Sequence, residues 1–185
     1  MKNRHTIGLS ELPIFDQKTR HLQAVIETPK GSRNKYRYNL ECNCVQLTSA
    51  LPAGMVFPFD FGFIPSTLAE DGDPLDVLIL MDAPTPPCCL LQCRLIGVME
   101  ARQKERGKKW ERNDRLFAVA VGAQTHDKVR TVADLPTHFV DDLTGFFSDY
   151  NKLHDKQFDC LGVSGPKKAH RLLKAAGDAY QKHKR

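Results

Sequence analysis

Short apolar runs separated by glycine, proline and polar turns dominate the chain from Val25 to Val121. Aromatic or aliphatic residues at alternate positions share one face of a strand, so this pattern predicts about six short strands. The predicted strands cover residues 22–27, 36–40, 57–65, 76–81, 90–99 and 116–121, with the segment at 57–65 expected to be irregular and residues 44–47 as a further candidate. The charged stretch 102–113 is predicted to be a hairpin tip. Short strands with turn signals between them indicate a small antiparallel β-barrel.

The pattern changes to helical spacing after Gly122. A helical turn stopped by Pro136 is predicted at residues 131–136. An apolar face at helical spacing between Pro136 and Leu153 predicts an amphipathic helix, and Pro166 suits the first turn of a second helix that runs to His183. The inward residues predicted for these helices are Phe139, Val140, Leu143, Phe146, Phe147 and Tyr150 in the first, and Leu172, Leu173, Ala176 and Tyr180 in the second. We therefore expect one α+β domain over residues 1–185, mainly β, as an OB-like antiparallel barrel with flanking C-terminal helices.

Composition adds a mild preference for anionic ligands. Apolar residues make up 41% of the chain and charged residues 26%, which is typical of a globular protein. The formal net charge is +5. The N-terminus from Met1 to His5 is polar, no apolar run is long enough to span a membrane, and no cysteines form a CxxC pair. These features predict a cytoplasmic protein with reduced thiols and no membrane segment.

Three carboxylates crowd into the turn before the strand at residue 76. Asp71, Asp73 and Asp76 are separated by Gly72 and Pro74. Carboxylates this close repel one another, so either the turn is solvated or a hard divalent cation with oxygen ligands neutralises it. An EF-hand is excluded because the glycine is misplaced and a strand follows where the EF-hand has a helix.

The aromatic segment at residues 57–65 has Phe at alternate positions around a single acid, Asp60. The phenylalanine side chain has no polar atom, so these rings are expected to pack in the core. Asp60 is expected either to turn out to solvent or to be held by a basic partner.

Several motifs, in this order along the chain, resemble the family I soluble inorganic pyrophosphatases. They are Val25-Ile26-Glu27-Thr28-Pro29-Lys30-Gly31-Ser32-Arg33-Asn34-Lys35-Tyr36, Pro58-Phe59-Asp60-Phe61-Gly62-Phe63-Ile64-Pro65, Asp71-Gly72-Asp73-Pro74-Leu75-Asp76-Val77-Leu78, Cys93-Arg94-Leu95-Ile96-Gly97-Val98, Asn113-Asp114-Arg115-Leu116 and Phe146-Phe147 with Tyr150. The resemblance covers roughly residues 22–152 and implies a divergent member of the family with its OB-like barrel.

The resemblance also implies hydrolysis of diphosphate to two phosphates with Mg²⁺. Asp73 would then accept the proton of the attacking water or orient that water. Metal binding would fall to Asp71, Asp76, Asp114 and Glu27, and phosphate binding to Lys35, Arg37, Arg115, Tyr150 and Lys152. Without the resemblance, Lys35 and Arg115 could equally be surface charges, and Tyr150 the polar edge of a core helix.

The chain departs from the family pattern in the positions expected around the substrate. Arg37 stands where the family usually has an acid, Ser49 where it has an arginine, and Phe61 where it has a tyrosine. Metal-binding acids align near Gln103 and Asn113, with Glu105 and Asp114 close by, and Asn151 replaces a lysine next to Lys152.

Two other functions stay open alongside diphosphate hydrolysis. The departures fit a pyrophosphatase-like protein that acts on or binds another phosphate compound, or that has lost activity. An OB-type nucleic-acid-binding module fits the barrel and the positive charge, although the aromatics cluster beside proline and acids, so nucleic acid is not the favoured partner. Homo-oligomer formation is expected from the resemblance.

Overall fold

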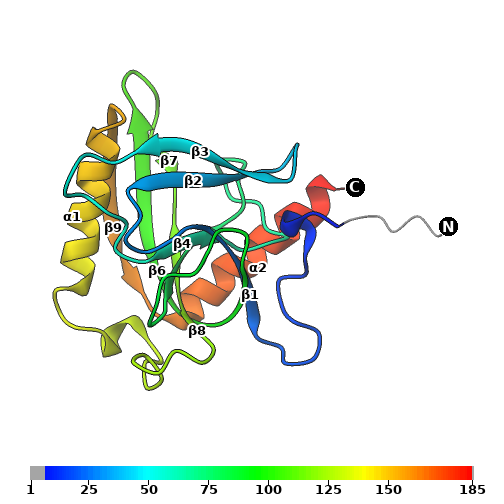
Figure 1. Ribbon diagram of the computed structural model, residues 1–185. Helices are drawn as coiled ribbons and strands as arrows, with labels where there is room; N and C mark the ends of the chain where they lie inside the picture. The colour runs from blue at the N-terminus through cyan, green and yellow to red at the C-terminus, as the bar shows by residue number, and fades with distance from the viewer. Residues whose placement is uncertain (1–6, 185) are drawn as a thin grey trace.

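The computed structural model describes residues 7–184 and contains a β-barrel flanked by two helices (Figure 1). The strands are β1 (Leu22–Thr28), β2 (Asn34–Asn39), β3 (Cys44–Ala50), β4 (Asp60–Phe63), β5 (Asp76–Leu80), β6 (Leu90–Glu105), β7 (Glu111–Arg112), β8 (Arg115–Ala120) and β9 (Lys156–Ser164). The helices are α1 (Phe139–Lys152) and α2 (Pro166–His183), with 3₁₀ turns at Leu9–Glu11 and Val132–Asp134. The polar N-terminal stretch discussed above lies, up to residue 6, outside the described residues.

Hydrogen-bonded pairing closes the strands into a ring. The order β1-β4-β5-β8-β6 returns to β1 through a further β1–β6 pairing, which leaves these strands without a free edge. The strands β2 and β3 form a separate ribbon. The predicted barrel is confirmed, but it is not wholly antiparallel, because β5 and β8 pair in parallel with Asp76 opposite Arg115.

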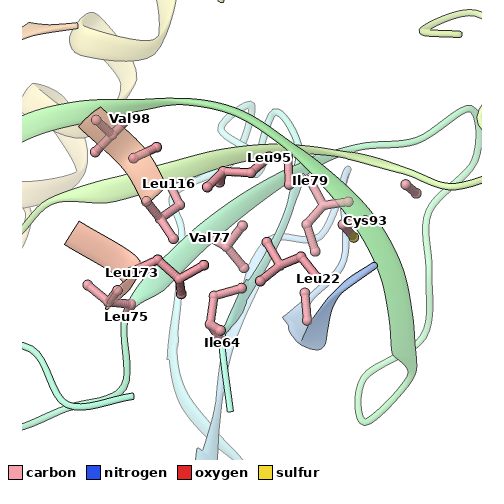
Figure 2. Close-up of a cluster of buried hydrophobic side chains, with 14 of the residues drawn as sticks. Leu22, Ile64, Leu75, Val77, Ile79, Cys93, Leu95, Val98, Leu116 and Leu173 are labelled. Atoms are coloured by element: carbon pink, nitrogen blue, oxygen red, sulfur yellow. The ribbon is translucent and has the colours of Figure 1, made fainter. Parts of the chain in front are cut away.

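Both faces of β5 and β8 are buried, which explains the continuous apolar run in β5. Val77 and Ile79 point into one cluster with Leu116, and their neighbours Leu78 and Leu80 point into a second cluster. Strands covered on both sides are apolar at every position. Figure 2 shows the first cluster, in which side chains from β1, β5, β6 and β8 converge inside the barrel.

The two helices cover different clusters. Ala169, Leu173 and Ala176 of α2 pack on the cluster of Figure 2. Phe139 and Leu143 of α1 pack on the second. The apolar faces predicted for both helices are therefore confirmed, since every residue expected to face inward is buried or partly buried.

The hairpin predicted around residues 102–113 is present, but its tip is shorter than expected. Strand β6 continues through its charged residues to Glu105, and β7 pairs with it at Gln103 and Arg102. The strand persists because β9 pairs along its other side and ion pairs compensate the charges, as between Arg102 and Asp159 at 2.7 Å. The sequence patterns above did not predict β9 at all, since its exposed and buried positions do not alternate regularly.

Asp60 has neither of the two environments expected for it. Its side chain is 1% exposed and accepts hydrogen bonds from the backbone N–H groups of Lys30 at 2.7 Å and Thr85 at 3.1 Å. Backbone donors satisfy a buried carboxylate without a basic partner. Asp60 thus links the turn before β2 to the proline-rich segment after β5.

No helix within residues 7–184 has the length and apolar character needed to cross a membrane.

Candidate functional site

A cavity of about 500 Å³ opens between the barrel, the β2–β3 ribbon and α1. Its charged and polar lining comes from segments far apart in the sequence. The lining side chains include Glu27, Lys35, Arg37, Thr48, Ser49, Asp73, Asp76, Gln103, Asn113, Arg115, Tyr150, Asn151, His154 and Lys156, together with Phe57, Phe61 and Phe147. Most of the residues predicted for the site therefore meet in one cavity.

The acidic turn is shaped by its glycine. Gly72 has φ +87°, a left-handed conformation that side chains rarely adopt, and its N–H bonds to the carbonyl of Ala69 at 3.1 Å. The Asp73 N–H donates to the Asp71 carboxylate at 3.2 Å. This turn directs Asp73 and Asp76 into the cavity, while Asp71 lies beside it.

Burial acts strongly on the carboxylates. Burial raises the pKa of Asp76 to about 6, although the positive charges of Arg115 and Lys35 oppose the increase. Burial also raises the pKa of Glu27, against the effects of Lys35 and of the Tyr38 N–H, which donates to the Glu27 carboxylate at 2.7 Å. Added positive charge in the cavity would lower the pKa of both acids and favour their ionised forms.

The cations of the cavity are held in place by aromatic rings and acids. The Lys35 ammonium lies 3.8 Å from the centroid of the Phe61 ring. Burial lowers the pKa of Lys35 below its usual value, although the negative charges of Glu27 and Asp76 oppose the decrease. Arg37, about half exposed, forms an ion pair with Asp73.

Arg115 is the most enclosed charge of the site. Its side chain is 3% exposed, and its guanidinium carbon lies 4.1 Å from the centroid of the Phe147 ring. One amino group donates to the Asn113 carbonyl at 3.0 Å. The Arg115 Nε is buried without a hydrogen-bond partner in the described chain, 3.9 Å from the nearest Asp76 carboxylate oxygen.

Three of the predicted site residues, Asp71, Asp114 and Lys152, are not part of the cavity lining. Asp114 accepts the Ala101 N–H at 2.9 Å and pairs with Arg112 at 2.8 Å, so its oxygens are occupied within the β6–β8 region. Lys152 pairs with Asp149 at 3.0 Å on an exposed face of α1.

The structure also brings in residues that the sequence did not indicate. His154 and Lys156 line the cavity from the end of α1 and the start of β9, a segment without a predicted element. Phe57 and Phe61 pack in the core as expected, but their rings also face Lys35. The spacing Lys35-Tyr36-Arg37 gave no signal for this contact, because Phe57 lies before β4 and Phe61 lies within it.

The donors fit a hard divalent cation by their chemistry. Glu27, Asp73 and Asp76 present carboxylate oxygens to the cavity, with Asp71 beside them, and such oxygens are the ligands that Mg²⁺ prefers. Among residues 7–184, no three His, Cys, Asp or Glu side chains converge closely enough to enclose an ion by themselves. Water or phosphate oxygens would therefore complete the coordination, as Mg²⁺ usually requires.

Comparison with known proteins identifies the family of this chain. A family model described as inorganic pyrophosphatase matches residues 24–181. The chain belongs to the inorganic pyrophosphatase family. An inorganic pyrophosphatase of Synechocystis is 36% identical over 156 residues, which cover 84% of this chain and 89% of that protein.

Solved pyrophosphatase structures share the fold. The crystal structure of inorganic pyrophosphatase from Thermus thermophilus superposes with a TM-score of 0.85 at 32% identity, covering 95% of this chain and 99% of that one. The Helicobacter pylori pyrophosphatase gives 0.82 at 29% identity, covering 92% and 98%. The resemblance and the OB-like barrel inferred from the sequence are both confirmed.

The departures from the pyrophosphatase pattern gather in the same place. Arg37, Ser49, Phe61, Gln103, Asn113 and Asn151 all line the cavity. These six departures therefore lie where a ligand would bind.

Proposed function

We propose that this chain hydrolyses inorganic diphosphate to two phosphates in a metal-dependent reaction, with Mg²⁺ as the metal. The observation that supports it is the cavity itself, where Glu27, Asp73 and Asp76 face Lys35 and Arg115. Diphosphate repels a nucleophile, so its hydrolysis needs cations beside the phosphates and an acceptor for the proton of water.

We assign the metal to Asp71 and Asp76, with Glu27 orienting its water ligands. When bound, Mg²⁺ supplies positive charge to the phosphate oxygens and acidifies water. The Asp73 carboxylate takes one proton from the attacking water. The water oxygen bonds to one phosphorus as the bridging P–O bond breaks, and the second phosphate leaves with the bridging oxygen.

The cations bind the substrate in this scheme. Lys35 and Arg115 are placed to hold phosphate oxygens because aromatic rings and acids fix both side chains. Tyr150 lines the same cavity and can donate its hydroxyl to phosphate. Arg37 reaches phosphate only if it leaves Asp73, and Asp114 and Lys152 take no direct part. Homo-oligomer assembly and a cytoplasmic location stay predictions.

A phosphate-release assay on the full chain with a Mg²⁺ titration tests this proposal. Asp73→Asn and Asp76→Asn should each lower the rate by about 100-fold or more, since each removes a charge that acts in the reaction. Asp178→Asn, on the exposed side of α2, is the matched control and should keep the rate. Absence of Mg²⁺-dependent release from wild-type protein would refute the proposal.

The other two functions have less support. Neither another phosphate compound nor nucleic acid is indicated by the matched pyrophosphatases. A panel of other phosphate compounds in the same assay compares their rates of hydrolysis with that of diphosphate.

A further inference from the structure

The cavity has two chemically different walls. Its carboxylates, Glu27, Asp73 and Asp76, all come from β1 and from the turn that leads into β5. The second wall is formed by residues of β6, β8, α1, β9 and the turns beside them, and it adjoins the first wall where Arg115 of β8 pairs with Asp76 of β5. Its lining side chains are Gln103, Asn113, Arg115, Phe147, Tyr150, Asn151, His154 and Lys156, none of which is a carboxylate. Cations are thus attracted to one wall only, and the other suits an anion.

Arg115 gives the second wall a fixed positive charge. A guanidinium stays protonated in proteins, and this one is held between the Phe147 ring, the Asn113 carbonyl and Asp76. The buried Nε lacks a hydrogen-bond partner within the described chain. Nearby carboxylate charge balances this arginine only in part, so a ligand anion would complete its environment.

Gln103 and Asn113 bring side-chain amides to the same cavity as Arg115. The Asn113 backbone is already engaged, since its N–H bonds to the Ala101 carbonyl at 3.0 Å and its carbonyl accepts from Arg115. The side-chain amides of Gln103 and Asn113 make no hydrogen bond to residues 7–184, and both line the cavity. An amide NH₂ donates to phosphate oxygens, but as a neutral group it attracts a divalent cation far less than a carboxylate does.

Lys156 adds charge at the edge of the same wall. Its ammonium lies 3.1 Å from Glu105, and its side chain is 33% exposed. The ring of His154 packs on Tyr150. Within residues 7–184, His154 is the only His, Cys, Asp or Glu side chain that this wall presents to the cavity. The wall therefore lacks the donors for a metal site of its own.

We propose that Gln103, Asn113 and Arg115 bind one phosphoryl group of the substrate directly, with no divalent ion between protein and phosphate. The metal is then confined to the carboxylate wall, and the second phosphoryl group lies there. This inference rests on the proposed function for the identity of the substrate. It makes Gln103 and Asn113 substrate-binding residues of this chain.

Binding of methylenediphosphonate, a diphosphate analogue that water does not cleave, tests the proposal by calorimetry. The full chain in excess chelator should bind the analogue saturably without metal. Gln103→Glu and Asn113→Asp should each weaken this metal-free binding by about tenfold or more, because each replaces a donor by a like charge. Gln103→Ala, which removes the donor alone, should weaken it by about fivefold.

Gln157→Glu is the matched control, because it adds the same charge on an exposed β9 position outside the cavity. It should change the affinity less than about twofold, since exposed charges are screened. Thermal melts check that each variant is folded. The proposal is overturned if wild-type protein binds the analogue only with metal, or if Gln103→Glu binds as well as Gln157→Glu.

Phosphate release with Mg²⁺, measured on the same samples, separates the two proposals. Release together with strictly metal-dependent analogue binding refutes direct phosphoryl binding and leaves the proposed function standing. Metal-free analogue binding without any phosphate release supports direct phosphoryl binding and refutes the proposed function.

Discussion

The Arg37 guanidinium forms an ion pair with the Asp73 carboxylate inside the cavity. The two residues come from different parts of the chain, β2 and the turn before β5. Both side chains are about half exposed, so the pair contributes little to stability and can open without a large cost. A phosphate ligand can therefore compete with Asp73 for the arginine, and opening the pair frees the carboxylate.

Arg37→Ala should raise the KM for diphosphate by about tenfold, because a hydrogen bond to a charged group is lost. Initial rates over a substrate series measure the change. Arg102→Ala is the matched control, since Arg102 also forms an ion pair, with Asp159 at 2.7 Å, but lies outside the cavity lining. Equal KM values for the two variants would argue against substrate contact by Arg37.

Lys35→Met should lower kcat/KM by about 100-fold, because a buried donor to developing phosphate charge is removed. The loss also removes a positive charge that lowers the pKa of Glu27 and Asp76. Lys30→Met in the preceding turn serves as the control, since its exposed side chain does not line the cavity. If both variants keep wild-type kcat/KM, Lys35 has no role in binding phosphate.

Asp82 should make stability depend on acid pH. The Thr125 hydroxyl and the backbone N–H groups of Gln124 and Thr125 donate to its carboxylate and hold its pKa below the usual value. Stabilisation by a carboxylate whose pKa is lower in the folded state is complete above the unfolded pKa of about 3.9 and is lost as pH falls through the folded pKa. The Tm advantage of wild type over Asp82→Asn should thus be constant from neutral pH to about pH 4 and narrow below it. An advantage that widens in acid would contradict this account.

Two glycine substitutions should have opposite effects on stability. A Cβ at Gly62 in β4 would lie 2.0 Å from the Val25 carbonyl oxygen, so Gly62→Ala should destabilise the barrel by about 3 kcal/mol. A Cβ at Gly145 in α1 meets nothing within 4 Å, and Gly145→Ala should stabilise by up to about 1 kcal/mol through helix propensity. Urea unfolding of both variants gives the two free energies. If Gly62→Ala keeps the wild-type free energy of unfolding, β1 and β4 separate more easily than their pairing indicates.

Thiol labelling should distinguish the cysteines by burial. Cys42, Cys44 and Cys88 are exposed, and the Cys42 and Cys44 sulfurs lie 3.1 Å apart. Cys93 is 1% exposed inside the barrel, where burial raises its pKa to about 12. Iodoacetamide at mildly alkaline pH should modify the first three and spare Cys93, because the thiolate is the reactive form. Peptide mass spectrometry before and after urea addition provides the measurement, and early labelling of Cys93 would show that the barrel opens.

Local patterns were enough to predict most of the strands and both helices. The apolar run of β5, the Pro166 start of α2 and the apolar face of α1 are each encoded by neighbouring residues, so no tertiary information was needed. The acidic turn, together with the other motifs that resemble the pyrophosphatases, likewise predicted the family and most of the candidate residues that line the cavity. Strand β9 was missed because its pairing with β6, and not its own periodicity, makes it a strand.

The sequence alone thus determined the element types, the crowded carboxylates and the residues Lys35, Arg37 and Arg115 as candidates. Only the tertiary structure decided which of them meet. In the folded chain Asp114 forms an ion pair with Arg112, and Lys152 forms one with Asp149. The Lys35 ammonium lies over the Phe61 ring. The physical reason is that charge pairing, desolvation and ring contacts depend on distances between strands, and a linear sequence does not contain those distances.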